Sequence, residues 1–154
     1  MYNEKTSFNY WIKDKVDLVS QKIGSDISLF VEEDEFNQYP SMVVAYPEED
    51  LYDFSMYRHY SIIEMNLYIL KSDTRTLELI KKHLYLEMGF TRANYQRYVE
   101  VPKLNYEASI SSPTFMENMR LYHADSGWEK IGDVDNEVRH YQKVWFLSYN
   151  MDHS

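Results

Sequence analysis

The histidines, acidic residues and glycines are the residues whose spacing could build a metal or catalytic site. The chain has five histidines, and none lies three or four residues from another, so no helical turn presents two histidine ligands. Two acidic runs, residues 32–35 and 48–50, lack the central glycine of a calcium loop. The four glycines are too scattered to form a phosphate-binding loop. The sequence therefore predicts no catalytic, metal-binding or cofactor-binding residues and favours a protein that is not an enzyme.

The composition argues against two further classes of protein. The formal net charge is −9, whereas a dedicated nucleic-acid binder needs clustered positive charge to neutralise phosphates. No apolar run approaches the roughly 18 residues of a membrane helix. We therefore expect neither sequence-specific contact with nucleic acid nor a membrane span. Cysteine is absent, which removes disulfides and thiolate metal sites.

Tyrosine is unusually frequent, with 15 in a chain of 154 residues. Tyrosine combines a large contact area with a polar tip and is enriched at protein interfaces. It also favours β-strands, so a β-rich fold would explain the same excess. The sequence leaves both explanations open.

The hydrophobic periodicity predicts two helices within one α+β domain that spans residues 1–154. The first is expected at 7–23 and the second at 73–88, because apolar residues recur there with helical spacing. Ser72 or Asp73 would cap the second helix by accepting hydrogen bonds from its free N–H groups. Gly89 would end it in the left-handed conformation.

Alternating patterns predict the strands and the core. The strands are expected at about 27–31, 41–46, 58–71, 95–101, 104–110, 115–122 and 138–149. Loops are expected at 32–38, 47–57 and 125–136, where acids, prolines and glycines gather. Shared periodicity within each element predicts a core of Ile12, Val16, Val19, Val43, Ile63, Met65, Leu67, Ile69, Leu77, Ile80, Leu84, Val144 and Phe146.

Positive charge gathers around the second predicted helix, including Arg92 just beyond its end. These residues would ordinarily form a solvated helix face, and contact with an acidic partner is the functional alternative. An exposed tryptophan in the glycine- and acid-rich loop would be a second contact candidate, although it could equally fold back onto the sheet. The interface candidates are Arg75, Lys81, Lys82, Trp128, Tyr52 and Tyr57.

The order of elements resembles that of the tail terminator (tail-completion) proteins of long-tailed bacteriophages, and of the head–tail joining proteins of the same neck region. A helix and a short strand precede Gln38, Tyr39 and Pro40, which open the next strand. The phrase YRHYSIIEMNLYILKSD then leads into the helix TRTLELIKKHLYLEMGF, and the chain closes on HYQKVWFLSYNM. The similarity covers roughly residues 7 to 150 and is a pattern of elements, without a catalytic signature.

This resemblance implies an α+β fold with a mixed or antiparallel sheet and two main helices packed on one side. It implies a homo-oligomer, a hexameric ring that caps the tail tube protein and offers a docking surface to a neck or head-completion protein. The location would be the virion tail or neck, after assembly in the host cytoplasm. The predicted loops would lie on the ring's contact surfaces. Acidic loops and the basic second helix on opposite faces would then select different partners.

Two other functions are compatible with the same residues. A small acidic binding protein or inhibitor could act on a host partner by using its negative surface to mimic nucleic acid. That protein would need its acids clustered on one face. An enzyme could assemble its site from residues distant in sequence, and it would show a deep pocket with perturbed titratable groups.

Overall fold

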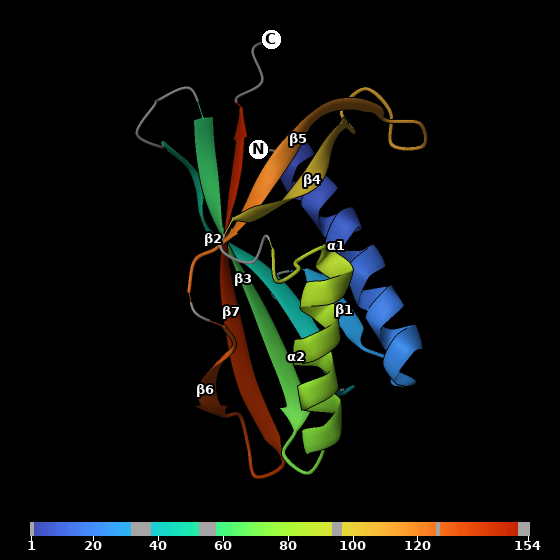
Figure 1. Ribbon diagram of the computed structural model, residues 1–154, viewed down its shortest axis with the longest axis vertical. Coiled ribbons are helices and arrows are strands. Elements are labelled where there is room, and N and C mark those ends of the chain that lie inside the picture. The colour runs from blue at the N-terminus through green and yellow to red at the C-terminus, as the bar shows by residue number, and fades with distance from the viewer. Residues whose placement is uncertain (1, 32–37, 53–57, 94–96, 126, 151–154) are drawn as a thin grey trace.

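A twisted sheet forms the framework of the protein, and two helices pack against one of its faces (Figure 1). The computed structural model describes residues 2–31, 38–52, 58–93, 97–125 and 127–150. Its elements are, in chain order, α1 (Tyr2–Ile23), β1 (Ser28–Val31), β2 (Ser41–Tyr52), β3 (Arg58–Leu70), α2 (Thr74–Met88), β4 (Tyr98–Asn105), β5 (Thr114–His123), β6 (Glu129–Asp133) and β7 (Val138–Asn150). The predicted α+β class is confirmed.

The sheet is built around β3 and β7, which pair antiparallel along their full length from Arg58↔Asn150 to Leu70↔Val138. The strand order is β1-β2-β3-β7-β5-β4, with β1 and β2 parallel. The other edge of β7 is divided between two partners, because β5 pairs with its second half and β6 with its first half. The sheet is therefore mixed, as expected.

Residues at both ends of α2 cap the helix as their side-chain and backbone chemistry predicts. The Asp73 carboxylate accepts a hydrogen bond from the Thr76 N–H at 3.3 Å, which satisfies one free donor of the first turn. Gly89 adopts φ 105°, a left-handed conformation that suits glycine. The Phe90 N–H then bonds to the Tyr85 carbonyl at 3.0 Å and closes the helix. The predicted C-terminal bound and both caps are confirmed, and the helix begins at Thr74, one residue later than predicted.

The core lies between the two helices and the sheet face that they cover. Ten predicted core residues are buried there, namely Ile12, Val16, Val19, Ile63, Met65, Leu67, Ile69, Leu77, Ile80 and Leu84.

Three core predictions chose the wrong face of a strand. In β7 the buried side chains are those of Trp145 and Leu147, whereas Phe146 is 36% exposed and Val144 is half-buried. Val43 is also half-buried, since its neighbours in β2 point into the core. Both faces of these strands carry apolar residues, so alternation fixes the period but not which face is inside.

Two element bounds differ from the sequence prediction near the N-terminal half. The helix α1 begins at Tyr2 rather than at 7, because its first turns hold buried polar residues that do not show apolar spacing. Strand β2 continues through Pro47 to Tyr52, so residues 47–52 are not a loop. A register shift between Ala45 and Glu48 lets the strand pass the proline, which cannot donate to a ladder.

Two further corrections concern the C-terminal half. In place of the predicted strands 95–101 and 104–110 the structure has one strand, β4, which contains Pro102 and ends at Asn105, and residues 106–110 form turns. Because β4 is the last strand of the sheet, the missing N–H of Pro102 costs no essential hydrogen bond. The predicted loop 125–136 contains β6, a short edge strand whose exposed residues give no apolar alternation.

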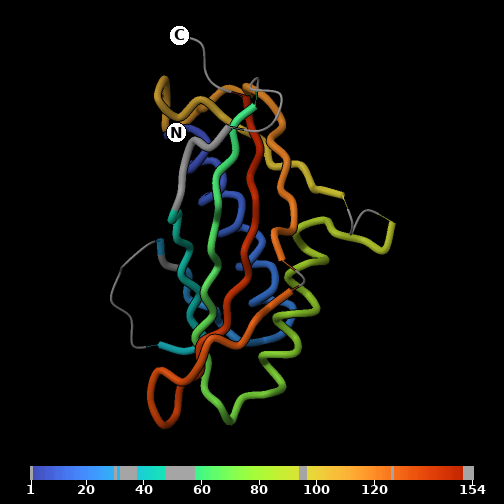
Figure 2. The backbone as a smooth tube through the Cα atoms, turned by 90° about the vertical axis from the view of Figure 1, so that its left-hand side faces the viewer, coloured from blue at the N-terminus to red at the C-terminus, as the bar shows by residue number. Residues whose placement is uncertain are grey.

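The opposite face of the sheet is not covered by any helix within the described residues, as Figure 2 shows with the sheet toward the viewer. A row of side chains crosses this face in register, from Tyr98 to Tyr122 to Phe146 to Ile62. Neither described helix has the length and apolar character that a bilayer span requires.

Candidate functional site

The basic residues predicted on the second helix occupy different environments. Arg75 is exposed in the first turn of α2. Lys81 is half-buried, pairs with Glu78 at 3.7 Å and lies over the ring of Tyr141 at 5.2 Å from its centroid. Lys82 is exposed and lines a pocket at the C-terminal end of the helix. Of the three, Lys82 is therefore the one that the structure brings to a pocket.

Of the remaining interface candidates, the structure describes Trp128 and the backbone of Tyr52. Trp128 is half-buried and packs against the core, so it folds back onto the sheet as the alternative in the sequence analysis anticipated. Tyr52 is the last residue of β2. Tyr57 and residues 32–37 lie outside the described residues.

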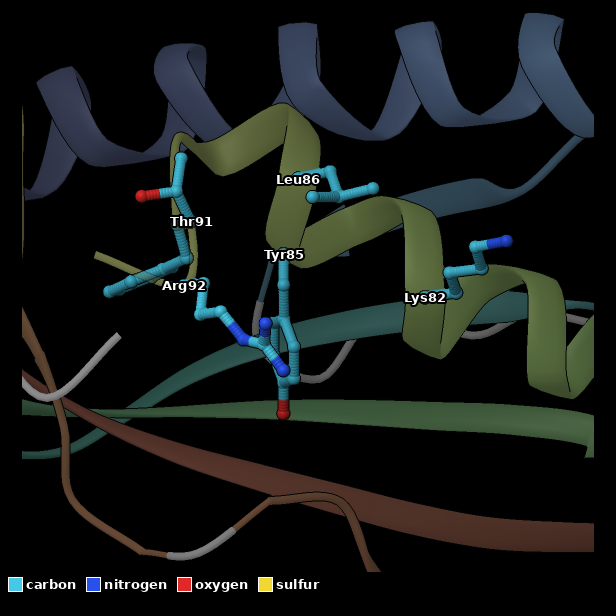
Figure 3. Close-up of a pocket in the computed structure, with 6 residues that line it drawn as sticks. Lys82, Tyr85, Leu86, Thr91 and Arg92 are labelled. Carbon is cyan, nitrogen blue, oxygen red and sulfur yellow. The ribbon is translucent and has the colours of Figure 1, made fainter. Parts of the chain in front are cut away.

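A pocket of about 460 Å³ lies beside the last turn of α2, and we refer to it as the α2 pocket (Figure 3). Its lining residues are Lys82, Tyr85, Leu86, Phe90, Thr91 and Arg92. The Tyr85 side chain points toward the sheet, while Leu86 is 52% exposed. Lys82 and Arg92 are exposed, and neither has an ion-pair partner within the described part of the chain. The pocket thus combines an apolar lining with two available positive charges.

Aromatic side chains from three elements support the floor of the α2 pocket. The Tyr85 ring meets Trp145 edge-on with centroids 5.9 Å apart, and Phe90 stacks on Trp145 at 5.6 Å. The His123 ring lies 4.3 Å from Phe90 and 4.8 Å from Trp145. Because these rings are held by α2, β5 and β7 together, the pocket floor is preformed.

Burial and charge set the protonation of this cluster. Burial lowers the pKa of His123 to about 4, and the neighbouring Lys143 charge acts in the same direction, while Asp125 opposes it. The Lys143 side chain is fully enclosed, bonds to Asp125 at 2.6 Å and lies over the Trp145 ring at 4.3 Å. Burial also lowers the pKa of Lys143, with Asp125 opposing the shift. His123 is therefore neutral near pH 7 and behaves as a packing residue.

A second surface is the end of the β4–β5 hairpin, residues 105–116, which we refer to as the hairpin tip. Figure 1 shows it extending beyond the body of the sheet. Ile110 is 68% exposed, Phe115 60% and Met116 39%, and Tyr2 of α1 adds a ring that is 49% exposed. Large exposed apolar surfaces often mark protein contact sites, so this end of the hairpin is a candidate for one.

The first residues of α1 hold the hairpin tip in place. The Asn3 side-chain oxygen accepts hydrogen bonds from the N–H groups of Tyr106 at 2.9 Å and Glu107 at 3.2 Å. The Tyr10 ring stacks on Tyr106 with centroids 5.2 Å apart. Within the tip, the Asn105 side chain accepts from the Ala108 N–H at 3.2 Å, which makes a local turn. The tip is thus anchored by side chains rather than left as a free loop.

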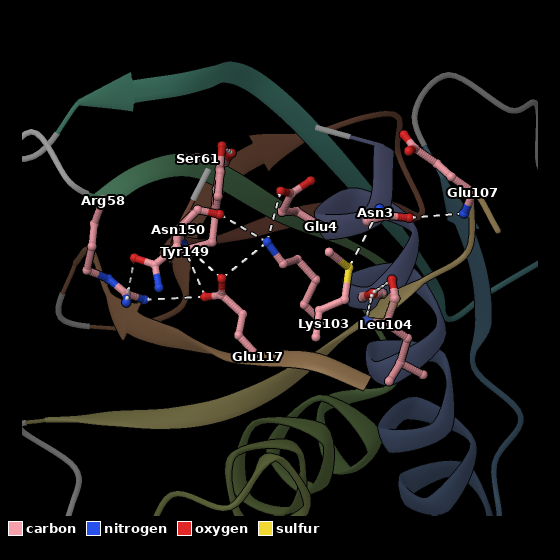
Figure 4. Close-up of polar contacts among 12 residues, drawn as sticks. Asn3, Glu4, Arg58, Ser61, Lys103, Leu104, Glu107, Glu117, Tyr149 and Asn150 are labelled. Atoms are coloured by element: carbon pink, nitrogen blue, oxygen red, sulfur yellow. Dashed lines mark hydrogen bonds and ion pairs between the residues drawn. The ribbon is translucent and has the colours of Figure 1, made fainter. Parts of the chain in front are cut away.

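A buried ion network fixes the strands that carry the tip (Figure 4). Lys103 of β4 is fully buried and its Nζ lies 3.4 Å from Glu4 of α1 and 3.2 Å from Glu117 of β5. The same Nζ donates to the Asn150 carbonyl of β7 at 3.0 Å. Arg58 of β3 lies 4.0 Å from Glu117 and extends the network to a fifth element. One lysine thereby ties the hairpin to the helix and the sheet.

Little in this arrangement favours bond-breaking chemistry. Within the described residues, no three His, Asp or Glu side chains converge as a metal site. The α2 pocket presents apolar surface and cations without a nucleophile aimed at a perturbed base. Its features suit recognition of an apolar group that carries a negative charge.

Sequence reasoning missed the residues that dominate these two surfaces. Ile110 and Phe115 were assigned to two ordinary strands, and apolar residues in strands are expected to point inward. The signal that indicates the tip is Pro113 with the two serines before it, which mark a turn between apolar residues. Arg92 was noted for its charge, but Tyr85 and Leu86 gave no sign of a pocket.

A comparison with protein-family models finds no match for the chain, and a comparison with curated proteins finds no significant match either. The resemblance to tail terminators therefore stays a prediction.

Proposed function

We propose that this protein is a structural virion protein of the tail terminator type, which assembles as a homo-oligomeric ring on the tail tube and connects the tail to the neck or head. The observation that carries the proposal is the hairpin tip, where Ile110 and Phe115 are 68% and 60% exposed. Leaving such apolar groups in water is unfavourable, and covering them stabilises an assembly by about 25 cal/mol for each Å² removed from water.

The way the tip is held supports a role in assembly. A flexible loop would lose conformational entropy when a partner ordered it, at roughly 0.5–1.5 kcal/mol for each immobilised side chain. The Asn3 hydrogen bonds and the Lys103 network already order the tip in the folded subunit, so this entropy is lost on folding and not on assembly. A preorganised apolar surface is suited to a subunit that must repeat the same contact in each copy.

The experiment compares single substitutions at the tip with one elsewhere. Ile110→Asp and Phe115→Asp place a charge on the tip, and Leu70→Asp places the same charge at the end of β3, where Leu70 is 37% exposed. Each variant is mixed with the tail tube protein of the same virus, because a terminator can stay monomeric until it meets its tube. Sedimentation measures the assembly, and thermal unfolding verifies the fold.

We expect the wild type and the Leu70 variant to assemble, and both tip variants to remain monomeric with a near-normal unfolding temperature. Assembly of the tip variants at wild-type levels would overturn the role given to the tip.

A further inference from the structure

The hairpin tip and the α2 pocket both carry apolar side chains, and their charges are opposite in sign. The tip presents apolar side chains, and Glu107 is the only residue among 105–116 that is charged at neutral pH. The α2 pocket has an apolar lining, and its two charged residues are the cations Lys82 and Arg92. If an apolar side chain of the tip occupied the pocket, the Glu107 carboxylate would lie near the positive charges of Lys82 and Arg92.

The two surfaces of one molecule cannot meet. Gly89, at the end of α2, lies next to Val99 at the start of β4, since a Cβ built on the glycine would be 3.5 Å from the valine side chain. The tip begins at the other end of β4, whose eight residues extend it by roughly 23 Å at about 3.3 Å per residue. The Lys103 network fastens that strand to its neighbours. Contact between tip and pocket must therefore be intermolecular.

We propose that the hairpin tip of one subunit docks into the α2 pocket of a second copy of this chain. Ile110 would enter between Tyr85, Leu86 and Phe90, and Glu107 would lie near Lys82 and Arg92. Because the two surfaces differ, this contact is head-to-tail, and a head-to-tail contact closes into a ring when its rotation permits. The inference rests on the proposed function and specifies which surfaces join the subunits.

The absence of native cysteine makes a direct test possible. Ile110→Cys and Leu86→Cys are prepared as separate variants, assembled together with the tube protein and oxidised mildly. The expected result is a covalent dimer in the mixture and none in either variant alone. Ile110→Cys mixed with Leu70→Cys is the matched control and should give no dimer. A dimer from Ile110→Cys alone would show a symmetric tip-to-tip contact and overturn the proposal.

A charge exchange provides an independent test. Glu107→Lys alone, and Lys82→Glu with Arg92→Glu, should each weaken assembly about tenfold, because like charges would face each other. Mixing the two variants, or combining all three changes in one chain, should restore much of it. Pocket reversal without effect on assembly would indicate that the pocket serves a small ligand or nothing, and would overturn the inference.

These outcomes separate the two proposals. Assembly without the Ile110–Leu86 crosslink overturns the tip-in-pocket contact and leaves the proposed function standing. A wild type that stays monomeric with the tube protein present overturns both.

Discussion

His123 lies where the floor of the α2 pocket meets the ion pair of the enclosed Lys143 with the partly exposed Asp125. Its imidazole is surrounded by the rings of Phe90 and Trp145, so the charged form loses solvation that water would supply. The positive charge of Lys143 disfavours a second cation nearby. The protonation of His123 should therefore make the stability of the protein depend on pH.

The direction of that coupling follows from the two pKa values. The pKa of His123 is about 4 in the folded protein and near 6.5 in an unfolded chain. Between these values the unfolded state binds the proton and the folded state does not, so stability falls as the pH falls through this window. Replacing His123 with Gln should make the urea midpoint less sensitive to pH between about pH 7 and pH 5.

Comparing pH slopes, rather than absolute stabilities, makes the test independent of any repacking that the substitution causes. Identical slopes for the wild type and the variant would contradict the assignment of this pH dependence to His123.

A buried lysine explains why the sequence pattern indicates the wrong inner face for β7. Lys143 shares the inner face of β7 with Trp145 and Leu147, and its side chain is fully enclosed. A lysine is almost never fully buried unless it is paired, so its presence made the inner face look like the outer one. The partner, Asp125, is 18 residues away in sequence, and no local pattern could have indicated the pairing.

Elements with strong periodicity and local caps were the most predictable parts of the fold. The β3–α2 unit agrees closely with prediction, because Asp73 and Gly89 act on their own backbone neighbours. Elements whose identity depends on position in the sheet were not predictable. Pro102 is tolerated because β4 is an edge strand, and β6 exists because β7 offers it a free edge. Both facts belong to the assembled sheet and are invisible in the local sequence.

The same limit applies to the candidate site. Lys82 and Arg92 could be noted as charges, but their pocket forms only when the end of α2 meets the rings of β5 and β7. The hairpin tip depends on Asn3, which is more than 100 residues from Tyr106 in sequence. Surfaces built from distant segments require the fold before they can be recognised.

Lys103 is the residue on which the attachment of the hairpin to the sheet most depends. It lies between Glu4 and Glu117 in a fully buried position. Its removal would take the Lys103 cation away from the buried Glu4 carboxylate and would leave Arg58, at 4.0 Å, as the cation beside Glu117. Lys103→Ala should therefore reduce the free energy of unfolding by about 3–5 kcal/mol. Urea unfolding followed by tryptophan fluorescence provides the measurement.

Lys13→Ala is the matched control for Lys103. Lys13 pairs with Asp17 at 3.1 Å, but both side chains are more than half exposed. An exposed pair at this helical spacing contributes about 0.5 kcal/mol or less. Equal losses for the two lysine variants would show that the buried network does not hold the hairpin.

The molecule presents three distinct surfaces: the hairpin tip, the α2 pocket and the sheet face that no described helix covers. A terminator needs at least this asymmetry, because one side of its ring must match the tube and the other must match the neck. The tip and the pocket would join neighbouring subunits, which leaves the open sheet face, with Tyr98, Tyr122 and Phe146 in register, for a different partner. The net charge of −9 would keep free subunits soluble before assembly.

Native mass measurement, made with a tail tube protein present, tests the terminator proposal most directly. Tube protein is polymerised with and without this protein, and tube length is measured in the same samples. We predict a closed ring at one end of each tube, with about six copies as the resemblance to tail terminators implies, and tubes that stop growing once it binds. A protein that stays monomeric while tubes grow to the same length with and without it would contradict the proposal.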